Sequence, residues 1–207
     1  MRSVAFLNRY TSLPVLLDAL FHKRITLLSP EAWEDRNDSY YIERYKQEKK
    51  FKTVLALCFT TKRETFHHWK IFSNGSSGVC IEFNKELLLN GLTEKNGFRL
   101  GPVTYKYIKE VQANKPALKD WPFLKRKPFE DEGEFRIIYE NATTEEKTKE
   151  IPFDIGCIRN ISLSPWLPES VAKTVIAVIK STEGCNKIRV IRSTLIENAT
   201  WRAAIEK

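Results

Sequence analysis

The sequence predicts an α+β fold with a mixed, mostly antiparallel sheet and flanking helices. Short apolar runs that are typical of strands outnumber the helical patterns, and the two kinds of element do not alternate regularly along the chain. Because parallel βαβ units require that alternation, most strand pairs are expected to be antiparallel. The 207 residues contain no repeat and no linker, so we expect a single domain over residues 1–207.

Strands are expected where β-branched and aromatic residues gather in short runs. The run Val54–Thr60 is apolar almost throughout, which is typical of a central strand. The other expected strands are 3–10, 25–28, 79–83, 98–107, 132–139, 150–153, 158–163 and 187–195. Apolar spacing and capping residues predict helices over 13–23, 38–50, 65–73, 84–89 and 169–182, with a helical tail at 199–207.

The composition excludes two broad classes of protein. Hydrophobic residues make up 42% of the chain and aromatic residues 12%, so the chain can bury a core and is not disordered as a whole. No apolar run approaches the roughly 20 residues that cross a bilayer, and the apolar run near the start is too short for a secretion signal. We therefore expect a soluble, cytoplasmic protein with no membrane partner.

The charge and the cysteines narrow the range of ligands. A formal net charge of +8 and a pI of about 9.3 favour a polyanionic partner, such as nucleic acid, or a ligand that carries phosphate. No two cysteines share the spacing of metal ligands, so we expect no metal site and four free thiols. These are Cys58, Cys80, Cys157 and Cys185.

Three charged residues, Glu132, Glu134 and Arg136, are spaced by two at the start of an apolar strand run. On a strand, that spacing places all three side chains on one face. Two carboxylates and a guanidinium are costly to bury and contribute nothing to an apolar core. If the face lines a cleft, it forms an acid/base or cation-stabilising site. If it faces water, it is an ordinary charged strand edge.

Basic and aromatic residues interleave between residues 106 and 129. Three prolines interrupt this stretch, so short helical turns and loop are expected there. Such a stretch can hold single-stranded nucleic acid by stacking and phosphate contacts, or it can be a solvated loop whose aromatic residues pack on the core. The candidate nucleic-acid-binding residues are Lys106, Lys109, Lys125, Arg126 and Lys127.

Several short motifs together resemble a prokaryotic family known as domain of unknown function 2971, in order and spacing over about the first two thirds of the chain. They are Arg9-Tyr10, Trp33–Asp38, Cys58–Thr60, Trp69 with Phe72, Gly78–Phe83 and Glu132-x-Glu134-Phe135-Arg136. The chain departs from the family in the acidic segment, where Asn-Asp-Pro and an aromatic residue are usual. It also departs at Phe72, where the family usually has Tyr.

The pattern is also similar to that of ADP-ribosyltransferases. Those enzymes carry an Arg or His on the first strand, a Ser/Thr or Tyr motif on a middle strand, and a Glu, often within Glu-x-Glu, on a later strand. Arg9, Thr60 (or Thr61) and Glu134 match these three motifs. The resemblance implies a split, mixed sheet with NAD, the substrate, between its two halves. It implies an NAD-dependent mono-ADP-ribosyltransferase, a toxin or phage-defence effector acting on nucleic acid. It leaves room for an antitoxin or immunity partner.

The chemistry explains why a fixed carboxylate is needed. Cleavage of the nicotinamide–ribose bond builds positive charge on the ribose, and a carboxylate near the ribose hydroxyls stabilises that charge. The resemblance gives this role to Glu134. Glu132 would then orient or deprotonate the acceptor.

The remaining candidate residues would bind NAD, and each has an ordinary structural alternative. Arg9 would hold a phosphate or ribose, or it pairs with a carboxylate across the sheet. Thr60 would position neighbouring groups, or it satisfies backbone groups at a strand end. Trp69 or Tyr10 would stack on nicotinamide, or both are core residues.

Two other functions stay open from the sequence. The first is a non-catalytic nucleic-acid-binding module on the same fold, which predicts salt-sensitive binding. The second is a metal-dependent nuclease that uses Asp35, Asp38, Glu132 and Glu134. The nuclease requires these carboxylates to converge within reach of one metal ion.

Overall fold

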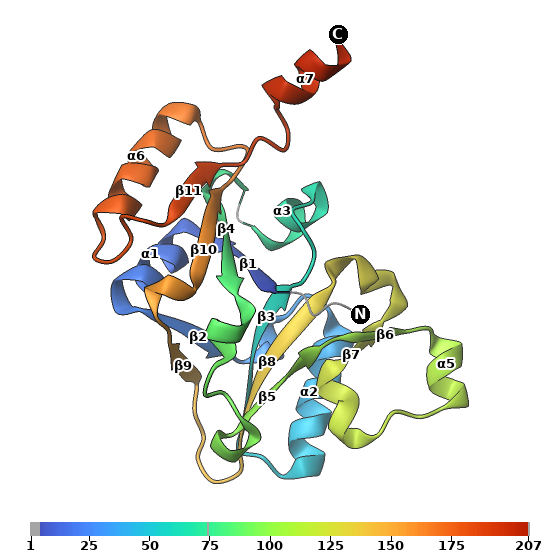
Figure 1. Ribbon diagram of the computed structural model, residues 1–207. Helices are drawn as coiled ribbons and strands as arrows, with labels where there is room; N and C mark the ends of the chain where they lie inside the picture. Colours follow the sequence, from blue (N-terminus) through green and yellow to red (C-terminus); the bar gives the residue numbers. More distant parts are fainter. Residues whose placement is uncertain (1–4, 74, 207) are drawn as a thin grey trace. The chain divides into compact units, whose positions relative to one another are not determined.

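A computed structural model describes residues 5–73 and 75–206 (Figure 1). The chain divides into two compact units, and each unit is discontinuous in sequence. The terminal unit comprises Met1–Arg24, Lys62–Leu88 and Phe153–Lys207, and the central unit comprises Ile25–Thr61 and Leu89–Pro152. The expectation of a single domain stays a prediction.

The terminal unit contains four strands in the order β11–β10–β4–β1. The pair β10–β11 is parallel, and the pairs β10–β4 and β4–β1 are antiparallel. The strands are β1 (Phe6–Ser12), β4 (Gly78–Asn84), β10 (Ile158–Leu163) and β11 (Arg189–Arg192). The helices are α1 (Leu13–His22), α3 (Phe66–Phe72), α4 (Lys85–Leu89), α6 (Glu169–Ser181) and α7 (Ala199–Ile205). Helix α6 packs on β11, and α1 and α3 pack on β1.

The sheet of the central unit is built around β8, which lies between β3 and β5 and is antiparallel to both. Strand β2 pairs with β3, and β9 continues the sheet beyond β2. These strands are β2 (Arg24–Leu28), β3 (Thr53–Thr60), β5 (Phe98–Pro102), β8 (Glu134–Asn141) and β9 (Thr148–Pro152). Along β3 and β8 eight residue pairs stay in register, from Thr53 opposite Asn141 to Thr60 opposite Glu134.

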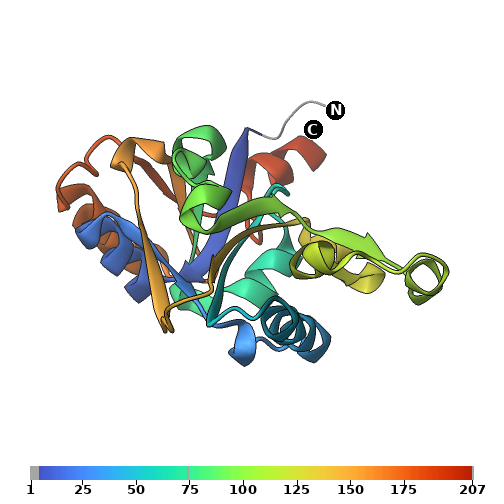
Figure 2. The ribbon, with the colours of Figure 1, turned by 90° about the horizontal axis from the view of Figure 1, so that it is seen from below.

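Between β5 and β8 the chain makes a long excursion, residues 104–127, which we call the basic excursion. It contains a parallel two-stranded ribbon of β6 (Thr104–Lys106) and β7 (Leu124–Arg126), with helix α5 (Ile108–Ala113) and the 3₁₀ helix η4 (Leu118–Phe123) between them. Figures 1 and 2 both show α5 at the end of the excursion that is farthest from β8. A further 3₁₀ helix, η5 (Lys127–Glu132), leads into β8.

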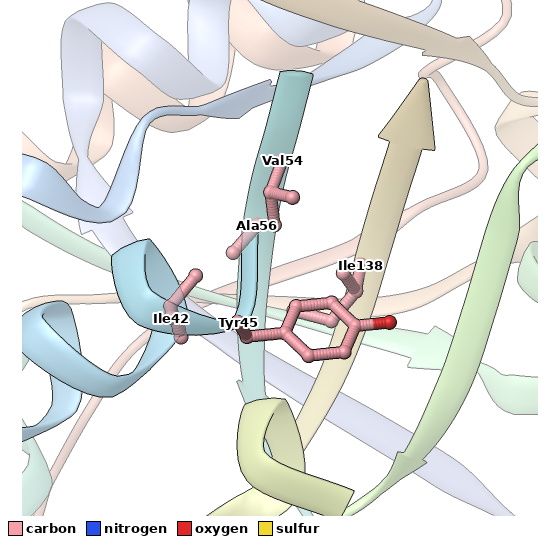
Figure 3. Packing of buried hydrophobic residues seen from close by; sticks show 5 residues of the cluster. All are labelled: Ile42, Tyr45, Val54, Ala56 and Ile138. Carbon is pink, nitrogen blue, oxygen red and sulfur yellow. The ribbon is translucent and has the colours of Figure 1, made fainter. Parts of the chain in front are cut away.

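Helix α2 (Arg36–Lys49) covers one face of the β3–β8 pair. Its buried side chains, Asp38, Ile42 and Tyr45, follow at spacings of four and three residues, so they lie along one stripe of the helix. Ile42 and Tyr45 pack against Val54, Ala56 and Ile138 of the strands (Figure 3). The stripe therefore changes from apolar to charged at Asp38, in the first turn of the helix.

The predicted fold class is confirmed: the sheet is mixed and mostly antiparallel, and helices flank it. The main differences lie at boundaries. The run 98–107 forms two separate strands, β5 and β6, and α2 begins at Arg36 because the carboxylate of Asp35 caps the helix by accepting from the N–H groups of Asn37 and Asp38. Positions 3, 4 and 207 of the predicted elements lie outside the described residues.

The strand predicted over residues 132–139 begins at Glu134 in the structure, two residues later than predicted. Gly133 has φ 53° and ψ 45°, a left-handed conformation that ends η5, and β8 begins at Glu134. Glu132 therefore does not lie on the strand, and the prediction that spacing by two places it on the face of Glu134 and Arg136 was wrong. Among residues 5–73 and 75–206, no helix is both long and apolar enough to span a bilayer.

Candidate active site

Five charged side chains of the central unit converge at the end of β8 where the strand begins. We call them the charged cluster: Asp38 from α2, Lys125 from β7, Glu132 from η5, and Glu134 and Arg136 from β8. Arg136 has no exposed surface, and the three carboxylate residues are 4–8% exposed. Opposite residues of an antiparallel pair project to the same face, so the register that places Ile138 opposite Ala56 also directs Arg136 and Glu134 towards α2.

Arg136 is the centre of the cluster. Its Nε and Nη2 donate to the two carboxylate oxygens of Glu134, both at 2.8 Å. Its Nη1 donates to Oδ1 of Asp38 and to the carbonyl of Pro122, both at 2.9 Å, and Nη2 also donates to Oδ2 of Asp38. These bonds engage all five N–H groups of the guanidinium. Arg136 therefore holds the cluster together and keeps no donor for a substrate phosphate.

Two further residues support this arrangement. The ring of Trp33 lies 4.9 Å from the guanidinium carbon of Arg136, close enough for a cation–π contact. The hydroxyl of Tyr105 accepts the main-chain N–H of Glu134 at 2.8 Å. The two contacts fix the cation and the start of the strand on which the carboxylate is carried.

Lys125 is the second cation. Its Nζ donates to Oε2 of Glu132 at 2.6 Å and lies 3.6 Å from Oε2 of Glu134 and 3.8 Å from Oδ2 of Asp38. Only 9% of its side chain is exposed. The sequence grouped Lys125 with the nucleic-acid-binding residues, but the structure places its ammonium among three carboxylates and not on an exposed basic surface.

Thr60 holds the segment that carries both glutamates. Its hydroxyl donates to the main-chain carbonyl of Glu132 at 2.6 Å, and the N–H and hydroxyl of Thr61 donate to the carbonyl of Gly133 at 2.9 and 3.0 Å. The two glutamates on either side of the left-handed Gly133 accept hydrogen bonds from different cations, Glu132 from Lys125 and Glu134 from Arg136. A direct contact of Thr60 with NAD stays a prediction.

The environment separates the pKa values of the three carboxyl groups. Burial alone would raise the pKa of Glu134, but the charge and hydrogen bonds of Arg136, with Lys125 and the thiol of Cys58, lower it to about 2. At Asp38, burial raises the pKa more than Arg136 lowers it. At Glu132, burial likewise raises the pKa more than Lys125 lowers it. Burial and the nearby Glu134 raise the pKa of the Cys58 thiol. Glu134 is therefore the carboxylate that stays ionised over the widest pH range.

The cluster is not electrically balanced. When all five groups are ionised, three carboxylates face two cations, which leaves one negative charge in excess. A site of this kind favours a positive charge beside it. It suits the stabilisation of a cation better than acid/base work by Glu134, whose pKa is too low for proton transfer at neutral pH.

The predicted NAD-binding residues Arg9, Tyr10 and Trp69 belong to the terminal unit. Trp69 has no exposed surface and Tyr10 only 9%. Their rings meet edge to face at 5.1 Å in a cluster with Cys80, and Nε1 of Trp69 donates to Glu64 at 2.7 Å. Both rings are packed as core residues, so stacking on nicotinamide stays a prediction that would require repacking. Arg9 is half-buried on β1, and its contact with NAD stays a prediction.

The other predicted nucleic-acid-binding residues lie on the basic excursion and differ in exposure. Lys109 and Arg126 are exposed, and Lys106 and Lys127 are half-buried. A cleft of about 600 Å³ borders the excursion, and its lining includes Arg99, Lys106, Lys115 and Phe123. Binding of nucleic acid by these residues stays a prediction.

Sequence reasoning missed four residues of the site: Trp33, Asp38 in its contact with Arg136, Cys58 and Tyr105. Only Asp38 left a usable signal, because a carboxylate in line with Ile42 and Tyr45 on the inner stripe of a helix needs a buried cation. Cys58 joins the site through the register of β3 and β8, Tyr105 through the course of the basic excursion, and Trp33 through the segment that leads into α2.

The carboxylates proposed for a nuclease do not form a metal centre. Asp38 and Glu134 form ion pairs with Arg136, and Glu132 forms one with Lys125. The side chain of Asp35 caps α2. Within 5–73 and 75–206, the structure contains no group of three or more His, Cys, Asp or Glu side chains that could hold a metal ion. The nuclease hypothesis therefore lacks its site in this part of the chain.

Comparisons with known proteins give a fold similarity and no family. No family model matches the chain, so the resemblance to domain of unknown function 2971 is not supported by this comparison. A search of curated proteins also finds no match.

Similar solved structures include DarT from Thermus sp. 2.9 in three complexes. The complex with NAD+ is 9% identical with a TM-score of 0.48, covering 92% of this chain and 96% of DarT. The complex with ADP-ribosylated ssDNA is 12% identical with a TM-score of 0.46, covering 91% and 94%. The complex with carba-NAD+ is 10% identical with a TM-score of 0.45, covering 93% and 97%. All three identities are 12% or less, and all three TM-scores lie below 0.5.

Proposed function

We propose that the chain is an NAD-dependent mono-ADP-ribosyltransferase and that its charged cluster stabilises the cationic ribose that forms as nicotinamide leaves. The observation that carries the proposal is the convergence of three nearly buried carboxyl groups on two cations, which leaves one negative charge in excess when all five groups are ionised. Burying an unbalanced ion group lowers stability, so the third carboxylate is not explained by the needs of the fold. It is explained by a positive charge that appears during a reaction.

The reaction balances with the residues of the cluster. The bond between the ribose C1′ and the nicotinamide nitrogen breaks, its electron pair leaves with neutral nicotinamide, and the ribose becomes positive. Glu134, ionised throughout, stabilises that charge. An acceptor atom then bonds to C1′ and loses its proton to the carboxylate of Glu132, whose raised pKa makes it the better base, and water finally takes the proton.

Nucleic acid is the acceptor that the charge distribution favours. Residues 104–127 contain seven basic and two acidic residues, within a chain of net charge +8. Tyr107 on the same excursion is 59% exposed, which provides a ring for stacking on a base. As part of the same proposal, the protein acts as a toxin or phage-defence effector by modifying nucleic acid and has an antitoxin or immunity partner.

The test is nicotinamide release and transfer of labelled ADP-ribose from NAD, with RNA, DNA or cell lysate as acceptor. Glu134→Gln keeps the shape of the side chain and removes its charge, so we expect a loss of about a hundredfold or more. The matched control is Glu140→Gln, the same change towards the other end of β8, which should keep the activity. In cells, expression of wild type and Glu140→Gln should slow growth, and expression of Glu134→Gln should not.

Two outcomes would contradict the proposal. One is a folded wild-type chain that consumes no NAD with any acceptor, and the other is a Glu134→Gln variant as active as wild type. A non-catalytic nucleic-acid-binding module is the second candidate, because the basic excursion alone accounts for it. It predicts salt-sensitive binding of nucleic acid that Glu134→Gln leaves unchanged.

A further inference from the structure

Asp38 reaches the charged cluster from a different direction than the two glutamates. It lies in the first turn of α2, 98 residues before Arg136, and is 4% exposed. The helix could be held to the strands without it, because Ile42 and Tyr45 already pack on β3 and β8. A buried carboxylate at this position therefore needs an explanation beyond the packing of the helix.

Asp38 shares one guanidinium with Glu134. Each residue uses both carboxylate oxygens to accept from Arg136, and Nη2 of Arg136 donates to both. The carbonyl of Pro122 and the ring of Trp33 hold the guanidinium in place, so it cannot turn wholly towards one carboxylate. The positive charge of Arg136 is therefore divided between two carboxylates, and Glu134 is neutralised less completely than it would be without Asp38.

We propose that Asp38 is a positioning residue for the transferase reaction, which acts through Arg136 to keep the negative charge of Glu134 available to the ribose. This inference rests on the proposed function. Without the charge of Asp38, two carboxylates would face two cations and the cluster would be neutral. The site would still bind NAD but would no longer favour a positive ribose over an uncharged one.

The test compares two analogues of ADP-ribose: one with a protonated ring nitrogen in place of the ribose oxygen, and one with an uncharged carbocyclic ring. Wild type should bind the cationic analogue more tightly. Asp38→Asn should weaken binding of the cationic analogue about tenfold or more and leave binding of the uncharged analogue unchanged. If Asp38 had a purely structural role, its replacement would weaken binding of both analogues equally, since a smaller folded fraction lowers the apparent affinity for every ligand alike. The matched control is Asp35→Asn, the same change at the cap of the same helix, which should alter neither.

The possible results separate the two proposals. If wild type binds neither analogue, or binds both equally, the proposed function fails and this inference fails with it. If wild type prefers the cationic analogue and Glu134→Gln removes the preference but Asp38→Asn does not, only the role of Asp38 is overturned. A turnover assay adds a second readout, in which Asp38→Asn should lower kcat and leave KM for NAD nearly unchanged.

Discussion

Two arginine networks join helix α2 to strand β8, one towards each end of the strand. Towards the far end, Nη1 of Arg99 donates to Glu140 at 3.1 Å and to the hydroxyl of Tyr45 at 2.9 Å, and Tyr45 donates to Glu140 at 2.6 Å. At the near end, Arg136 binds Asp38 and Glu134. The helix contributes a neutral hydroxyl to the first network and a carboxylate to the second.

The difference shows what the fold requires and what it does not. One arginine, one glutamate and a neutral group suffice to join the helix to the strand at Arg99, and the charges there cancel. The side chains of Arg99 and Glu140 keep 19% and 12% of their surface exposed, whereas Arg136 keeps none. The third carboxylate therefore stands where burial makes it most costly, which points to a use other than stability.

The largest expected difference between the two networks is in stability. Arg136→Met should lower the free energy of unfolding by about 3–5 kcal/mol, because Asp38 and Glu134 would be left as neighbouring buried carboxylates. Arg99→Met should lower it by about 1–2 kcal/mol, since Glu140 remains partly hydrated. Urea denaturation at neutral pH measures both, and equal losses would show that the two networks do not differ in kind.

The second largest difference between the two networks is expected in how stability depends on pH. The pKa of Glu134 lies near 2 in the folded chain against an ordinary value of 4.5, so its ionised form stabilises the fold above pH 4.5 and this contribution is lost as the pH falls towards 2. The shift corresponds to about 3 kcal/mol. Asp38 and Glu132 act in the opposite sense, because their raised pKa values favour folding when they are protonated and oppose it as the pH rises.

This dependence is measured by denaturation of wild type and Glu134→Gln at several pH values between 2 and 5. The wild-type chain should lose stability on acidification more steeply than the variant. Parallel curves would mean that Glu134 is not held ionised by Arg136, and the charge excess assigned to the cluster would be wrong.

The smallest effect is expected at the hydroxyl of Tyr45. Tyr45→Phe removes two hydrogen bonds of the Arg99 network but leaves the ring packed on Ile138, so unfolding should become easier by about 1 kcal/mol. NAD turnover should not change, because this end of β8 carries no excess charge. A loss of turnover equal to that of Glu134→Gln would contradict the assignment of catalysis to one end of the strand.

The sequence predicted the strands well because period-two alternation and apolar runs are local signals, and β3, β4 and β10 fall where those signals lie. It also placed Glu134 and Arg136 on one face of one strand. The partnership of Arg136 with Asp38 spans 98 residues and depends on the packing of α2 on β8, which no local pattern encodes. The inward position of Lys125 could not be predicted for a related reason, since no local pattern in the basic stretch shows which lysine of β7 is buried; its binding of nucleic acid stays a prediction.

Gly133 separates two glutamates, Glu132 and Glu134, that accept hydrogen bonds from different cations. A regular strand would have presented both carboxylates to the same environment, and they would have repelled each other there. The single left-handed residue instead rotates the chain between them, so that one accepts its hydrogen bond from an ammonium and the other from a guanidinium. A glycine, which has no side chain, thereby determines which cation each of the two glutamates accepts a hydrogen bond from.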